Sequence, residues 1–262
     1  MTEMTSYAPG TPCWVDLGSP DIDASTDFYG QLFGWEVPQS DNAEQTGGYR
    51  IATSGGKSAA GMMPLMQEGQ PPAWSTYVSV EDADATAEKV KQAGGQVIAE
   101  PMDVMDLGRM AIFADPTGAV FGIWQPGNFS GAELVNEPNT YSWNELNTRD
   151  PDAAKAFYAA VFGWGVEDQD VEGMTYTLFQ VADRPVAGAM TTPAAVPDEV
   201  PAFWLAYFGV EDCDATVARV EELGGSVMSP KILEMEGVGR FAIVADPHGA
   251  AFGVIAGANP DE

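Results

Sequence analysis

Two carboxylates follow tryptophans at the same spacing in two separate segments of the chain. Trp14 and Asp16 lie two residues apart in a short apolar segment, and Trp143 and Glu145 repeat the arrangement. Because side chains alternate between the faces of a strand, each tryptophan and its carboxylate share one face. An apolar aromatic pocket raises the pKa of a carboxyl group, which can then remove a proton next to a carbonyl near neutral pH. The alternative is a hydrogen-bonded structural group or a surface residue at a strand end.

The two segments belong to an internal repeat. Residues 9–37 align without gaps on residues 138–166, with 13 identities in 29 positions. Further on, GRMAIFADPTGAVFG ends the first copy and GRFAIVADPHGAAFG ends the second, with 11 identities in 15 positions. The duplication predicts two domains of ordinary size, an N-terminal one over 1–130 and a C-terminal one over 131–262.

Each half is predicted to contain two β-α-β-β-β modules. In the first module a strand and a helix capped by Ser19 or Asp21 precede three strands, over 13–17, 21–32, 35–37, 49–53 and 57–63. The second module repeats this order over 74–80, 82–93, 96–99, 109–113 and 119–124. Gly94 and Gly95 end the second helix, and residues 115–118 (DPTG) form a hairpin turn between the last two strands.

These modules, with the FYxxxFGW segment, the GGxV after each second helix and the GRxAIxADPxGAxFG ending, resemble the vicinal oxygen chelate superfamily. This superfamily includes glyoxalase I, the bleomycin-resistance proteins and the extradiol dioxygenases. The resemblance covers nearly the whole chain and is greatest to the tandem actinobacterial type. It implies an α+β fold of four modules in two tandem domains. Each domain would be an incomplete eight-stranded barrel, shaped like a cup that holds the ligand.

The resemblance also implies where a metal ion would be bound. Family members that use a metal hold it from the first, fifth and eighth strands of a cup. The corresponding positions here are Trp14 and Trp143, then Ser75 and Leu205, then Gly122 and Gly253. Divalent cations need imidazole, carboxylate or amide donors, so we expect neither a metal nor another cofactor. The only histidine, His248, is expected to be an exposed turn residue.

The same comparison suggests which residues line each cup. In the first cup the candidates for substrate binding are Trp14, Ser75, Tyr77 and Trp124, and in the second they are Trp143 and Tyr207. Arg109 and Arg240 occupy equivalent positions and are candidates for binding an anionic or carbonyl oxygen. Their alternative interpretation is a salt-bridged strand start.

Composition limits the partners. Eleven Lys and Arg against 39 Asp and Glu give a net charge of −28, which disfavours binding to nucleic acid or anionic membranes. No apolar run of ~18 residues and no leader-like start is present, so we expect a cytoplasmic protein. Cys13 and Cys213 suggest neither a disulfide framework nor a metal site. The expected partner is a small carbonyl or aromatic molecule, and the expected state is a monomer or homodimer.

Three functions fit these observations. The first is a glyoxalase-like enzyme that acts on reactive carbonyl compounds such as methylglyoxal, with Asp16 and Glu145 as metal-free acid–base groups. The second is a tailoring enzyme of aromatic polyketide metabolism, which the tryptophan-rich first cup would suit. The third is a binder that sequesters a small molecule without changing it. The fold alone does not choose among them.

Overall fold

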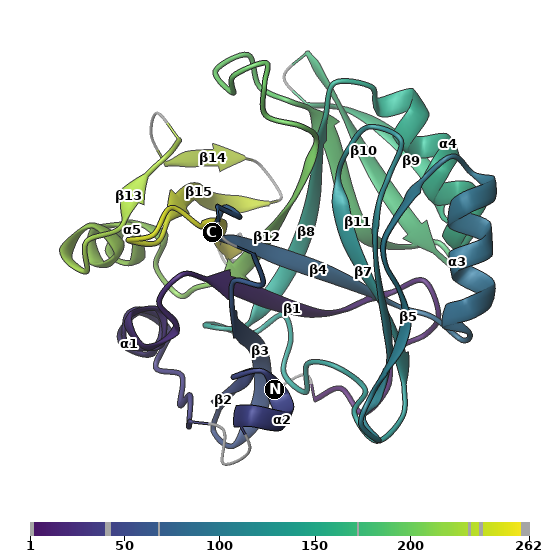
Figure 1. Ribbon diagram of the computed structural model, residues 1–262. Helices are drawn as coiled ribbons and strands as arrows, with labels where there is room; N and C mark the ends of the chain where they lie inside the picture. Colours follow the sequence, from purple (N-terminus) through teal and green to yellow (C-terminus); the bar gives the residue numbers. More distant parts are fainter. Residues whose placement is uncertain are drawn as a thin grey trace.

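The computed structural model describes residues 3–39, 43–67, 69–171, 173–229, 232–235 and 238–257. Both halves of the chain show the predicted alternation of strands and helices (Figure 1). The elements of the first half are β1 (Pro12–Ser19), α1 (Ile22–Phe33), α2 (Ala43–Thr46), β2 (Arg50–Ser54), β3 (Lys57–Pro64), β4 (Ala73–Ser79), α3 (Ala83–Gln92), β5 (Gln96–Val104), β6 (Gly108–Ala114) and β7 (Val120–Pro126).

The second half follows the same order. Its elements are β8 (Tyr141–Thr148), α4 (Pro151–Phe162), β9 (Gly165–Val171), β10 (Met174–Val181), β11 (Arg184–Thr191), β12 (Phe203–Gly209), α5 (Cys213–Glu222), β13 (Ser226–Val227), β14 (Leu233–Met235), β15 (Gly239–Ala245) and β16 (Ala251–Gly257). Among the described helices, none combines the length and apolar character needed to cross a membrane.

Each half forms its own open sheet. The first has seven strands in the order β2-β3-β1-β4-β7-β6-β5. The second has nine, in the order β13-β15-β16-β12-β8-β11-β10-β9 with β14 also paired to β15. The strands that carry the two Trp-x-carboxylate segments, β1 and β8, lie inside these sheets, between β3 and β4 and between β11 and β12. The predicted α+β class is confirmed.

The strand numbers depart from the expected eight for local reasons. In the first half, residues 35–37 form only one bridge, between Glu36 and Thr53. Trp35 instead turns into the core, where it is 4% exposed and its Nε1 donates to the Asn139 carbonyl at 2.8 Å. The second half has the full strand β9 at this place. Its ninth strand arises because the counterpart of β5 is divided into β13 and β14.

Helix ends follow from the sequence. Asp21 caps α1 by accepting a hydrogen bond from the Ala24 amide at 3.0 Å, and Gly34 ends the helix in the left-handed region with φ 71°. Asp150 and Gly163 do the same for α4. The choice left open between Ser19 and Asp21 is therefore decided for Asp21, which fixes where β1 stops and α1 begins.

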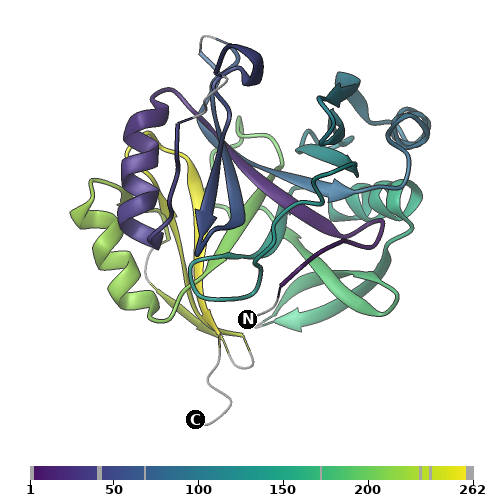
Figure 2. The same cartoon turned by 90° about the horizontal axis from the view of Figure 1, so that it is seen from below.

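The two halves share their cores. Helix α1 lies beside α5 and α3 beside α4, so that each helix pair combines both halves (Figures 1 and 2). Tyr29 on α1 donates to Asp246 Oδ2 of the second half at 3.2 Å, and Tyr158 on α4 donates to Asp115 Oδ2 of the first half at 3.0 Å. These buried contacts tie each FY segment to the DPxG turn of the other half. His248, which was expected to be exposed, is half-buried in this turn, and its backbone amide donates to Asp246 Oδ1 at 2.9 Å.

Candidate acid–base sites

Strand β1 holds the first candidate carboxylate in the interior of the first sheet. Asp16 is 3% exposed and Trp14 is 5% exposed. The Cα of Asp16 is paired with Gly61 on β3 and with Ser75 on β4, while Trp14 is paired with Tyr77 on β4. Strand alternation therefore brings the predicted residues Trp14, Asp16, Ser75 and Tyr77 together, as the sequence indicated.

Hydroxyl groups surround the Asp16 carboxylate. Tyr49, just before β2, donates to Asp16 Oδ2 at 3.3 Å and accepts a hydrogen bond from Trp14 Nε1 at 2.7 Å. Tyr77 and Ser75 also hydrogen-bond to the carboxylate. Burial raises the pKa of Asp16 to about 6, although the three hydroxyl partners act to lower it. Burial and the neighbouring carboxylate raise the pKa of both tyrosines, which stay protonated donors.

The second half repeats this arrangement around Glu145 on β8, which is 8% exposed. Tyr176 donates to Glu145 Oε2 at 3.1 Å and accepts from Trp143 Nε1 at 3.0 Å. Tyr207 donates to Glu145 Oε1 at 3.1 Å, and Asn147 Nδ2 donates to the same oxygen at 3.3 Å. Burial raises the pKa of Glu145 against the effect of these bonds. Each half thus contains one buried carboxylate between two tyrosines.

The positions that would hold the family's metal ion are shaped for tyrosine rings. Gly122 and Gly253 are the Cα partners of Tyr77 and Tyr207, and a Cβ at either glycine would overlap the facing ring. Trp14, at the first metal position, has only an N–H donor and no lone pair for a cation. Among the residues that the structure describes, no three His, Cys, Asp or Glu side chains gather as a metal site. The residues present therefore do not fit the metal.

Further aromatic side chains pack around the tryptophan of the first site, and the second site differs in this respect. Phe129, from the segment after β7, meets Trp14 edge-on with ring centroids 4.9 Å apart and Trp124 at 6.0 Å. Trp124 Nε1 donates to the Phe129 carbonyl at 2.8 Å. Trp124 thus adjoins Trp14 through Phe129. Ile255 occupies the corresponding place in the second half, where Trp143 is only half-buried.

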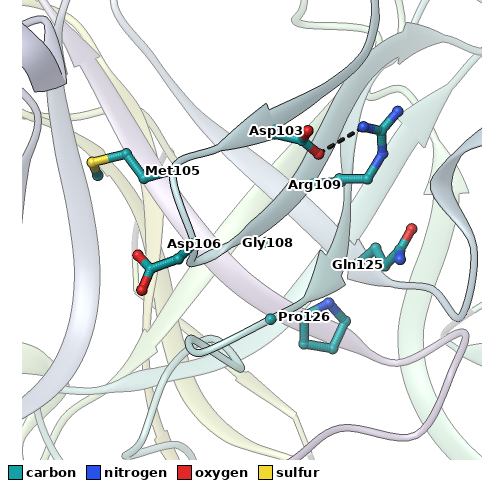
Figure 3. A pocket seen from close by; sticks show the side chains of 8 residues that line it. Asp103, Met105, Asp106, Gly108, Arg109, Gln125 and Pro126 are labelled. Atoms are coloured by element: carbon teal, nitrogen blue, oxygen red, sulfur yellow. Dashed lines mark hydrogen bonds and ion pairs between the residues drawn. The ribbon is translucent and has the colours of Figure 1, made fainter.

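The two candidate arginines are engaged elsewhere. Arg109 on β6 pairs with Asp103 at 2.6 Å and with Asp84 at 3.1 Å, and it lines a surface pocket of about 220 Å³ together with Asp103 (Figure 3). Arg240 on β15 pairs with Asp214 at 2.7 Å in the same way. The structure does not bring these guanidinium groups to the buried carboxylates, because an acidic residue at the start of the adjacent helix neutralises each one.

Sequence reasoning missed Tyr49, Tyr176 and Asn147. The two tyrosines lie in loops and strands of low similarity between the halves, outside the segments that align well. A signal was nevertheless present. Gly61 and Gly188 lie in the related stretches AGMM and AGAM, which align with each other. Tyr49 precedes Gly61 by the same number of residues as Tyr176 precedes Gly188, so this alignment also pairs the two tyrosines.

Comparison with known proteins agrees with this architecture. The model of the Glyoxalase/Bleomycin resistance protein/Dioxygenase superfamily matches residues 13–123 and 139–254. The chain belongs to this superfamily. "Anthracycline biosynthesis protein DnrV" of Streptomyces peucetius is 42% identical over 266 residues, which cover 96% of this chain and 95% of that protein. "Putative glyoxylase CFP32" of Mycobacterium bovis is 42% identical over 261 residues, covering 97% and 98%.

A solved structure shows the same fold at low identity. The Mn(II)-bound glyoxalase from Novosphingobium aromaticivorans superposes with a TM-score of 0.66 and 17% identity, covering 95% of this chain and 82% of that chain. The superfamily and the tandem α+β fold predicted from the sequence are thereby confirmed. At 17% identity the similarity shows the fold alone. The chemistry has to be argued from the residues of each site.

Proposed function

We propose that this chain acts on small carbonyl compounds by moving a proton between carbon and oxygen, with Asp16 and Glu145 as the proton carriers and without the family's metal ion. The observation that carries the proposal is a carboxylate buried between two tyrosines in each half. With a pKa of about 6, the Asp16 carboxyl is largely ionised near neutral pH and readily reprotonated. Methylglyoxal-type compounds are the first substrates to examine.

The proposed step is keto–enol tautomerisation. The carboxylate takes a proton from the carbon next to the carbonyl, and the C–H electron pair forms the C=C bond while the carbonyl π pair moves to oxygen. The carboxylic acid then returns the proton to that oxygen, which gives a neutral enol. The indole N–H of Trp14 or Trp143 donates to the oxygen as negative charge develops there, a stabilisation that water cannot provide as effectively. Tyr77 or Tyr207 holds the carboxylate in position.

Hydrogen–deuterium exchange tests the proposal. The protein, dialysed against EDTA, is incubated in D₂O with methylglyoxal or with 2-tetralone, a fused-ring ketone, and loss of the C–H signals is followed by proton NMR. We expect exchange faster than in buffer for at least one ketone, and a return to the buffer rate when Asp16→Asn and Glu145→Gln are combined. Exchange at the buffer rate with both ketones, or exchange that only protein not treated with EDTA catalyses, would contradict the proposal.

A second candidate is tailoring of an aromatic polyketide. Two observations favour it: the relative from Streptomyces peucetius is named for anthracycline biosynthesis, and Trp14, Trp124 and Phe129 form an aromatic wall beside the first carboxylate. Polycyclic ketones should then bind with quenching of tryptophan fluorescence and be converted. A ligand recovered unchanged after many hours would instead identify a sequestering protein.

A further inference from the structure

Tyr49 and Tyr176 connect the tryptophan and the carboxylate of each site. Each hydroxyl lies between a tryptophan N–H and a carboxylate oxygen, accepting from the first and donating to the second. Both tyrosines are half-buried, whereas Asp16 and Glu145 beneath them are almost fully buried. The exposed part of each tyrosine thus gives its buried hydroxyl a connection to the surface that the carboxylate itself lacks.

The opposite strand leaves room for these hydroxyls. A Cβ at Gly61 would overlap the Tyr49 hydroxyl, and a Cβ at Gly188 would overlap the Tyr176 hydroxyl. Gly61 and Gly188 are also the Cα partners of Asp16 and Glu145 on the neighbouring strand. The same recess, lined by a glycine, a tryptophan N–H and a carboxylate, thus exists twice and in both cases contains a phenol group.

We propose that the ligand of each site is a planar molecule with a hydroxyl on an sp² carbon, a phenol or an enol. The hydroxyl groups of Tyr49 and Tyr176 occupy the place of this ligand hydroxyl, and the ligand displaces them when it binds. This inference rests on the proposed function, because a phenol is the stable counterpart of the enol that proton transfer forms. The ligand hydroxyl would accept from the tryptophan N–H and donate to the carboxylate, as the tyrosine hydroxyl does. The exchange keeps the number of hydrogen bonds unchanged.

The two tyrosines of each site have different roles in this account. Tyr77 lies on β4 inside the sheet with its ring against Gly122, and Tyr207 is placed in the same way on β12. Tyr49 instead precedes β2, the edge strand of the first sheet. Its side chain can leave without breaking the sheet interior. Tyr176 lies on β10, between β11 and β9, so in the second site the side chain has to rotate away while the strand stays paired. A buried carboxylate also repels anions, which favours a neutral hydroxyl over a carboxylate ligand.

Calorimetric titration with 2-naphthol and 2-methoxynaphthalene tests the proposal. The methyl ether cannot donate to the carboxylate and would leave it unpaired, so we expect the intact protein to bind 2-naphthol at least about tenfold more tightly. Tyr49→Phe combined with Tyr176→Phe removes the competing hydroxyls and should strengthen 2-naphthol binding further. The matched control is Tyr29→Phe, because Tyr29 also lies between a tryptophan and a carboxylate, Trp74 and Asp246, but on a core helix. It should leave the binding unchanged.

A second variant tests the ligand class in a site from which the competing tyrosine hydroxyl has been removed. Tyr49→Ala empties the recess, and we expect 4-methylphenol, the missing side chain, to raise the unfolding temperature of this variant while toluene does not. Equal affinity for 2-naphthol and its ether, no binding of either, or equal effects of 4-methylphenol and toluene would overturn the inference. Preferential 2-naphthol binding without deuterium exchange in either methylglyoxal or 2-tetralone would contradict the proposed function and leave the ligand class supported. Deuterium exchange without preferential binding of 2-naphthol would support the proposed function and overturn the inferred ligand class.

Discussion

The two carboxylate sites share one arrangement but complete it with different residues. Both contain a tryptophan, a carboxylate and two tyrosines in the same hydrogen-bonded order. The first site uses an aspartate and takes its third donor from Ser75 on the neighbouring strand. The second uses a glutamate, and its third donor is Asn147, two residues further along β8.

The differences compensate for each other. Glu145 faces Leu205 at the position where Asp16 faces Ser75, so the second site loses a hydroxyl partner across the sheet. Asn147 replaces that partner, at a position where the first half has Gly18. Three donors to a buried carboxylate are thus retained by two different routes. Both halves keep the tryptophan, a buried carboxylate and the tyrosine pair, which together form the unit on which the proposed function rests.

The largest expected effect comes from removing the carboxylates. Asp16→Asn combined with Glu145→Gln should slow deuterium exchange by about 10²-fold to 10⁴-fold, the usual contribution of a general acid–base group. Each single variant should retain the activity of the other site. Glu145→Gln should remove the larger share, because the second site lacks the cover of Phe129 and Trp124. A double variant as active as the unchanged protein would eliminate both sites as centres of the reaction.

The second-largest expected effect is the pH dependence that Asp16 gives to the free energy of unfolding. Folding raises the Asp16 pKa from 3.8 to about 6, so the ionised group destabilises the fold and this cost grows as the pH rises through that window. Relative to Asp16→Asn, the free energy of unfolding should fall by about 2 kcal/mol between about pH 4.5 and about pH 7.5. Urea unfolding of the unchanged protein and of Asp16→Asn at both pH values measures this difference in the free energy of unfolding. A difference that is independent of pH would show that Asp16 has an ordinary pKa.

The two glycines at the positions that correspond to the family's metal ligand should tolerate a side chain poorly. In Gly122→Ala or Gly253→Ala the new methyl group overlaps a buried tyrosine ring, and overpacking of this kind costs about 1–3 kcal/mol. Gly257→Ala is the matched control in β16, because nothing lies within 4 Å of its Cβ position. Unfolding curves that coincide for Gly253→Ala and Gly257→Ala would mean that the Tyr207 ring is not packed as described.

The smallest effect is expected for the two arginines. Arg109→Gln and Arg240→Gln remove exposed ion pairs, which contribute little to stability. Both variants should leave the deuterium exchange rate and the unfolding midpoint unchanged within measurement error. Loss of exchange in either variant would restore the arginines as candidates for binding the substrate oxygen.

The sequence was most informative where the repeat and the strand period act together. The gapless alignment around Trp14 and Trp143, with side chains alternating along a strand, predicted which residues face each other across β1, β4, β8 and β12. It could not predict Tyr49 and Tyr176, because Tyr49 lies in the turn before β2 and Tyr176 on β10, two places that align poorly between the halves and whose position beside β1 and β8 depends on the whole sheet. For the arginines the salt-bridged alternative describes the structure. The sequence could not name their partners Asp84 and Asp214, because these lie on α3 and α5, whose placement beside β6 and β15 depends on the fold.

Carbon-13 NMR titration of the carboxyl groups tests the central claim most directly. In protein labelled at the aspartate and glutamate side-chain carboxyl carbons, we predict one resonance with a pKa of about 6 that disappears in Asp16→Asn. A second resonance, also titrating above the ordinary range, should disappear in Glu145→Gln. Ordinary carboxyl pKa values for both residues would contradict the account, because neither group would then be the buried proton carrier described here.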